Sequence, residues 1–135
     1  MDSDPREQAL ERIANGRPIE WIGRALRRID GVRVHVRFCG TDPNRPKHFK
    51  FGINAASLSA DEELWVCGDQ GDFFLVPVSS VRAIYSDPAG YIDGHHPRIR
   101  VLSVDIRRLL SKYARGKNAL DLRPYHGRTI TSRAA

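Results

Sequence analysis

The side chains with the clearest chemical signal in this 135-residue sequence are its arginines and lysines. They outnumber the acidic residues 22 to 16 and give the chain a formal net charge of +6 at pH 7. Such an excess favours an anionic partner, and nucleic acid is the first candidate because phosphate contacts dominate its affinity for proteins. The predicted nucleic-acid-binding residues are Arg24, Arg27, Arg28, Arg33, His35, Arg37, Arg45, Lys47, Lys50, Arg107, Arg108, Lys112 and Arg115.

The first set of these cations falls on a helix predicted to open at Pro18 and to end at Asp30-Gly31. Proline suits the first helical position, and a glycine commonly follows the last turn of a helix. Apolar side chains recur at helical spacing and form one stripe, at Ile19, Ile22, Leu26 and Ile29. The guanidinium groups of Arg24, Arg27 and Arg28 are expected on the opposite side of this helix.

The second set falls on two segments in which apolar and basic residues alternate, the pattern of a half-buried strand. Within Val32–Phe38 the apolar residues alternate with Arg33, His35 and Arg37. Within Lys47–Ile53 the apolar residues alternate with His48 and Lys50. We expect the two strands to pair as a hairpin with a long connection, so that their basic side chains share one surface. The connecting loop adds Arg45 and Lys47.

The third set belongs to a helix predicted to start at Ser103 or Asp105 and to run to about Ala114. Its expected buried face consists of Ile106, Leu109, Leu110 and Tyr113. Its expected exposed face consists of Arg107, Arg108, Lys112 and Arg115. Each of the three basic sets therefore lies opposite an apolar face, which would hold the charges in fixed positions.

The remaining pattern completes an α+β fold. A capped helix is predicted from Asp4 to about Ala14, and a hairpin is predicted from Glu63–Cys67 and Phe73–Val78, followed by a short helix that begins at Ser79. Ile99–Val104 is a further strand. We therefore expect a small mixed or antiparallel sheet of about five strands with two N-terminal helices and one C-terminal helix. Residues 1–128 form a single domain in this prediction, and residues 129–135 form a flexible tail.

Histidines are the candidates for metal chemistry. His95 and His96 are adjacent in a polar loop, Asn118 follows, and His126 lies 8 residues beyond it. The order His, Asn, His is similar to the motif of the HNH nucleases, but a predicted strand and helix fill the gap where that motif has a hairpin. The expectation is therefore solvated histidines, with no metal and no cofactor. Cys39 and Cys67 lack zinc spacing and are expected to be buried small residues.

A second likeness concerns the strands Val32–Phe38 and Phe49–Ile53, followed by the hairpin and its short helix. Over Gly31–Tyr85 this order resembles the later half of the restriction-endonuclease-like, PD-(D/E)XK, nucleases. In that family two acids hold Mg²⁺ and a lysine supports the attacking water. The matching strand here reads His35-Val36-Arg37, and arginine scarcely gives up its proton. The resemblance therefore implies a domain that has kept a binding surface for DNA and has lost cleavage.

These observations predict a non-catalytic domain that binds nucleic acid, with DNA favoured, mainly through the phosphate backbone. One alternative is a structural or protein-interaction subunit that self-associates through exposed strand edges. A further alternative is a metal-dependent nuclease. No apolar run approaches the roughly 20 residues of a membrane helix, and the first residues are polar, so we expect a cytoplasmic protein with no membrane partner.

Overall fold

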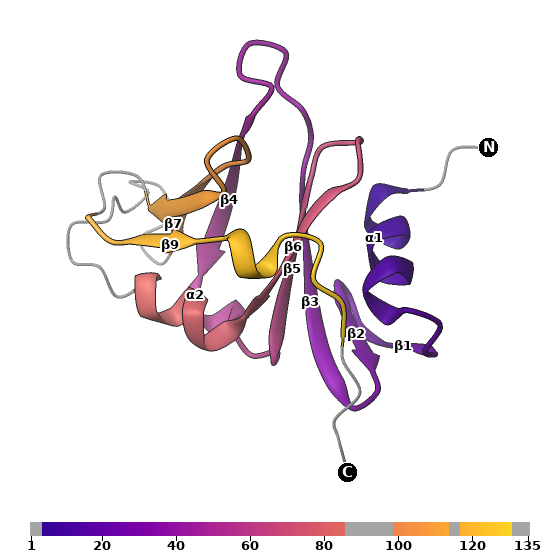
Figure 1. Cartoon of the computed structure of the whole chain (residues 1–135). Coiled ribbons are helices and arrows are strands. Elements are labelled where there is room, and N and C mark those ends of the chain that lie inside the picture. The colour runs from indigo at the N-terminus through magenta and orange to yellow at the C-terminus, as the bar shows by residue number, and fades with distance from the viewer. Residues whose placement is uncertain (1–3, 86–98, 114–116, 131–135) are drawn as a thin grey trace.

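The computed structural model describes residues 4–85, 99–113 and 117–130, and within them the chain is an α+β structure (Figure 1). It has two α-helices, α1 (Pro5–Ala14) and α2 (Val78–Tyr85), and two short 3₁₀ helices, η1 (Ala55–Ser57) and η2 (Arg123–Tyr125). The described strands are β1 (Ile19–Gly23), β2 (Leu26–Ile29), β3 (Val32–Cys39), β4 (His48–Asn54), β5 (Glu62–Cys67), β6 (Asp72–Pro77), β7 (Ile99–Asp105), β8 (Leu110–Tyr113) and β9 (Ala119–Asp121).

The strands form two sheets. The five-stranded sheet has the order β1-β2-β3-β5-β6, and the four-stranded sheet has the order β4-β7-β8-β9. Neighbouring strands are antiparallel except β3 and β5, which are parallel. After β3 the chain crosses from the five-stranded sheet to the four-stranded sheet, where it forms β4. It then returns to the five-stranded sheet and forms β5.

The five-stranded sheet lies in the middle of the molecule and is covered on both faces (Figure 1). On one face it packs against α1, whose buried Leu10 and Ile13 meet strand residues such as Val34 and Leu64. On its other face a larger core joins it to the four-stranded sheet and α2. The stacked rings of Phe51 in β4 and Trp65 in β5, 6.0 Å apart between centroids, belong to this second core.

Several predicted elements are confirmed. Asp4 caps α1 by accepting a hydrogen bond from the backbone N–H of Arg6, and Asn15 ends the helix in the left-handed conformation. The Val32–Phe38 strand, the hairpin of β5 and β6, the short helix after it and the Ile99–Val104 strand are all present. Ile130 differs from the prediction of a flexible tail over residues 129–135, because it is buried and its N–H donates to the carbonyl of Ile13. No helix in these described parts is long and apolar enough to cross a membrane.

The predicted Pro18–Asp30 helix is wrong, because this segment is the hairpin of β1 and β2. The apolar positions that suggested a helical stripe are divided between the two strands. The chain turns at Ala25, which has φ +61°, and turns again at Asp30 and Gly31, with φ +51° and +77°. Two successive residues with positive φ are typical of the tight turn that joins antiparallel strands, so the segment forms a three-stranded meander with β3.

The predicted C-terminal helix is also wrong. The segment after Asp105 is a turn followed by β8. The Asp105 carboxylate accepts hydrogen bonds from the backbone N–H groups of Arg107 and Arg108, the same bonds that cap the start of a helix, but here they close a turn that no helix follows. Leu109 then adopts φ +54°, a conformation that no α-helix contains.

The predicted pairing of Val32–Phe38 with Lys47–Ile53 is wrong as well. Strand β3 pairs with β2 and β5, whereas β4 pairs with β7 in the other sheet. The basic side chains of the two strands therefore do not share the exposed surface that a hairpin would have given them.

Replacement of Ala25 by glycine should stabilise the protein by about 0.5–1 kcal/mol. The left-handed conformation costs a residue with a Cβ about 1–2 kcal/mol, and glycine loses part of that gain through the entropy of the unfolded chain. In a helix the same substitution would cost about 0.5–1 kcal/mol. The measurement is the free energy of unfolding in urea.

The matched control is Ala83→Gly, because Ala83 is exposed within helix α2. It should lose about 0.5–1 kcal/mol. A loss of stability in both variants would contradict the hairpin assigned to residues 19–29.

Candidate functional site

Two residues of the second predicted basic set, His35 and Arg37, are largely withdrawn from solvent. Glu63 of β5 is 0% exposed, and the Arg37 Nε lies 2.5 Å from its Oε1. His35 Nδ1 lies 3.3 Å from the other carboxylate oxygen. Arg37 also donates to the carbonyl of Gly52 and to the hydroxyl of Ser57, which ties β3 to β4 and η1. Arg37 therefore joins the two sheets, and the side chains of His35 and Arg37 are both engaged by Glu63.

The Glu63 carboxylate is ionised because its neighbours outweigh its burial. Burial alone would raise the pKa of Glu63, but the contact with His35 and the charge and hydrogen bond of Arg37 lower it below its ordinary value of 4.5. A buried charge that lost its partner would be strongly destabilising, so Glu63 and Arg37 depend on each other.

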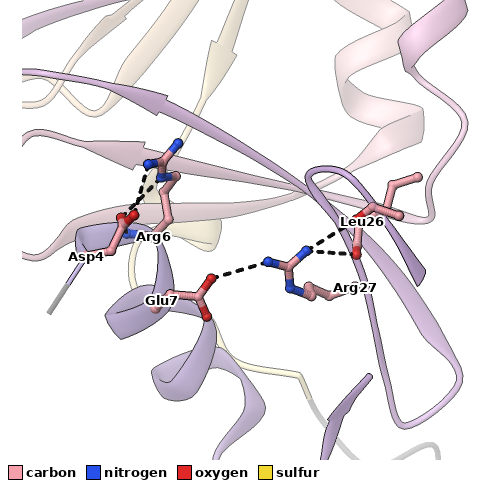
Figure 2. A network of polar contacts seen from close by, with 6 residues as sticks. Asp4, Arg6, Glu7, Leu26 and Arg27 are labelled. Atoms are coloured by element: carbon pink, nitrogen blue, oxygen red, sulfur yellow. Dashed lines mark hydrogen bonds and ion pairs between the residues drawn. The ribbon is translucent and has the colours of Figure 1, made fainter. Parts of the chain in front are cut away.

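The first predicted basic set is partly used in structural contacts. Arg27 is 8% exposed and its guanidinium lies 4.0 Å from the ring centroid of Trp21. Figure 2 shows the same guanidinium bonded to the Glu7 carboxylate of α1 and to the carbonyl of Leu26. Arg28 pairs with Glu20 at 3.1 Å. Arg24 is exposed beside this network.

Arg33, from the second set, also has an acidic neighbour. Its Nε lies 3.8 Å from Asp61 Oδ2, and its backbone N–H donates to the same carboxylate oxygen. Neither the hairpin of β1 and β2 nor the start of β3 therefore forms a surface of unopposed positive charge.

The exposed face of the four-stranded sheet does gather cations. The register places Lys50 of β4 opposite Ser103 of β7, Ser103 opposite Lys112 of β8, and Lys112 opposite Ala119 of β9. Directly paired residues share a face of a sheet. Lys50 and Lys112 are exposed, whereas their neighbours along each strand, such as Phe49 and Tyr113, are buried in the core. The two lysines therefore stand on either side of a small serine.

Two neighbouring depressions, which share lining residues, lie along this face. The larger, of about 470 Å³, is lined by residues of the 40–48 loop and of β7, β8 and β9, including Arg45, Ser103, Arg108 and Lys112. The smaller, of about 160 Å³, shares Arg45 and His48 with it and extends to Lys50. We call this surface the basic face and define it by Arg45, His48, Lys50, Arg108, Lys112 and Lys117.

Formal cations outnumber carboxylates in the described lining of the two depressions. The two depressions contain five formal cations, Arg45, Lys50, Arg108, Lys112 and Lys117, against two carboxylates, Asp42 and Asp105.

Both carboxylates have structural roles. Asp42 accepts from the backbone N–H of Asn44, and Asp105 holds the turn between β7 and β8. Although burial raises the pKa of Asp105, the N–H groups of Arg108 and Arg107 lower it below its usual value, so this carboxylate is ionised near neutral pH. The basic face keeps a net positive charge.

The structure thus brings together four predicted residues, Arg45, Lys50, Arg108 and Lys112, and adds two that were not predicted as site residues. His48 alternates with Lys50 along β4, and this pattern was visible in the sequence. Lys117 carried no local signal, because its position follows from the pairing of β8 with β9. Lys47 and Arg107 are exposed in neighbouring turns, and Arg115 lies outside the described residues.

The histidines do not form a metal site in the described part of the chain. No group of three or more His, Cys, Asp or Glu side chains that could hold a metal ion occurs there. His126 lies 3.3 Å from the Asp72 carboxylate and stacks on Phe74. His95 and His96 lie outside the described residues.

Comparison of the chain with protein-family models, with curated proteins and with solved structures finds no match to any of them. The resemblance to the PD-(D/E)XK nucleases therefore stays a prediction, and the site must be interpreted from its own residues.

Replacement of Glu63 by glutamine should destabilise the protein by about 3–5 kcal/mol at pH 7, because the buried Arg37 would lose its counter-charge. The folded-state pKa of Glu63 lies below 4.5, so ionised Glu63 stabilises the fold above that pH. This contribution is lost as the pH falls through the lowered folded-state pKa. The difference in unfolding free energy between wild type and variant should therefore shrink on acidification.

The control is Glu20→Gln, which breaks the exposed ion pair with Arg28. It should cost no more than about 1 kcal/mol. Equal losses in the two variants, or a wild-type advantage that does not change with pH, would contradict the role assigned to Glu63.

Proposed function

We propose that this chain is a non-catalytic domain that binds the phosphate backbone of nucleic acid through the basic face of its four-stranded sheet. The observation that carries the proposal is the cross-strand row of Lys50, Ser103 and Lys112. Two strand spacings separate the lysines by about 10 Å, and the backbones that carry them are fixed by the core beneath. Because the backbone is already ordered, only the lysine side chains lose conformational freedom when they bind phosphates, which lowers the cost of binding.

The chemistry of the face favours backbone contacts over contacts with bases. Sheets that bind single-stranded RNA present aromatic rings on which bases stack. Apart from the imidazole of His48, the outward-facing positions of β4, β7 and β8 carry mainly lysine, glycine, serine and aliphatic side chains, and the larger aromatic residues of these strands, such as Phe49 and Tyr113, lie in the core. A double helix, with DNA as the expected polymer, is the ligand that such a surface suits best.

The other two interpretations have less support. A nuclease needs acids that are free to hold Mg²⁺, and the buried acid of the five-stranded sheet, Glu63, is engaged by Arg37 and His35. One edge at which the chain could self-associate is β1, where Trp21 is 67% exposed. The register between β1 and β2 shifts between Trp21 and Gly23, and an irregular edge of this kind disfavours the addition of another strand.

The double variant Lys50→Gln with Lys112→Gln should weaken binding to duplex DNA and reduce its salt dependence. Each lost phosphate contact lowers the slope of log affinity against log salt by about 1, so the slope should fall by about 2. The loss should be equal for unrelated sequences because the contacts are to the backbone. Fluorescence anisotropy with labelled duplexes over a range of salt concentrations measures both quantities.

The charge-matched control is Arg28→Gln with Arg33→Gln, which removes two cations from paired positions of β2 and β3. This control should keep the wild-type slope. The proposal fails if the wild-type chain retains no duplex at low salt, or if the two double variants lose affinity equally.

A further inference from the structure

Cys39 and Cys67 occupy directly paired positions at the ends of the parallel strands β3 and β5. Both thiols are free, and both side chains contact the core between the two sheets. The N–H of Gly68 donates to the carbonyl of Cys39 at 2.8 Å and holds the two strand ends together. Adjacent strands lie about 4.7–4.9 Å apart, which falls within the Cα separation of about 4.4–6.8 Å that a disulfide requires.

The two thiols differ in their access to a reagent. Cys67 is 1% exposed, and burial raises the pKa of its thiol. Cys39 is half-buried and lines the smaller depression of the basic face together with Arg45, His48 and Lys50. A reagent from solution therefore reaches Cys39 first, and the neighbouring cations favour a reagent with negative charge.

We propose that Cys39 is a thiol-exchange site for anionic low-molecular-weight disulfides of the glutathione disulfide class, and that Cys67 converts the adduct into an internal Cys39–Cys67 disulfide. This proposal stands independently of nucleic-acid binding.

The reaction has two exchange steps. In the first, the Cys39 thiolate forms a bond to one sulfur of glutathione disulfide, the reagent's own disulfide bond breaks, and one glutathione leaves as its thiolate. In the second, the Cys67 thiolate attacks the Cys39 sulfur and expels the second glutathione. The leaving thiolates take up the protons that the two cysteines release. The protein is oxidised by two electrons, and one glutathione disulfide is reduced to two glutathione molecules.

The burial of Cys67 determines how the bridge forms and how it is removed. Its raised pKa makes the second step slower than the first, because only the thiolate attacks. The strand spacing of about 4.7–4.9 Å is also shorter than the commonest Cα separation of a disulfide, about 5.5–6 Å, and departures of this kind make a disulfide easier to reduce. The bridge is therefore expected to be reversible by dithiothreitol.

The test uses the full chain with glutathione disulfide, followed by intact-mass spectrometry and titration of free thiols. Wild type should pass through a single adduct and end with both thiols lost and a mass lower by two hydrogen atoms. Cys67→Ser should stop at the adduct, and Cys39→Ser should remain unreacted while folded. A wild-type product that keeps its adduct, or a Cys39→Ser variant that reacts at the wild-type rate, would overturn the proposal.

A second measurement needs no variant and so does not depend on the folding of a mutant. At low salt, wild type should react roughly 3- to 10-fold faster with anionic glutathione disulfide than with the cationic disulfide cystamine, and salt should shrink the difference. Equal rates, or a faster reaction with cystamine, would show that the cations of the basic face do not select the reagent.

Discussion

The ion pair of Glu63 with Arg37 is the contact on which the arrangement of the two sheets depends. It lies between the five-stranded and four-stranded sheets, and Arg37 reaches across to the carbonyl of Gly52 in β4. A buried carboxylate and a buried guanidinium are tolerated only when each satisfies the other. The contacts of Arg37 bring β3, β5 and β4 together at one place, and they withdraw this guanidinium from the surface.

The exposed chemistry of the molecule follows from that packing. One face of the four-stranded sheet supplies Phe49, Phe51 and Tyr113 to the core, so alternation along the strands sends Lys50 and Lys112 to solvent. The turn held by Asp105 and the loop that carries Arg45 border the same face. The cations of the basic face are thus positioned by backbone that the core has already ordered, whereas several of those on the five-stranded sheet are opposed by Glu7, Glu20, Asp61 and Glu63.

Local signals predicted the elements that local contacts stabilise. Asp4 and Pro5 marked the start of α1, and the turn between Cys67 and Asp72 marked the hairpin of β5 and β6. The spacing of Ile19, Ile22, Leu26 and Ile29 fits a helix and a hairpin equally well, and the left-handed conformation of Ala25 leaves no trace in its residue type.

In the candidate site, too, local signals predicted some features, whereas others depend on contacts between residues that are distant in the sequence. Lys50 and Lys112 could be predicted as exposed cations, although the element assigned to Lys112 was wrong. The burial of His35 and Arg37 depends on Glu63, which is 26 residues from Arg37 in the chain and opposite His35 only because β3 and β5 are parallel. A partner that distant is determined by the packing of the sheets, which residue periodicity does not report.

The most direct measurement is a map of backbone amide chemical shifts during titration of the isotope-labelled protein with a short DNA duplex. If the basic face binds the duplex, the largest changes should fall on β4, on the turn between β7 and β8, on β8 and on the 40–48 loop, with little change on β1 and β2. Changes concentrated on the hairpin of β1 and β2, or no changes at low salt, would contradict it.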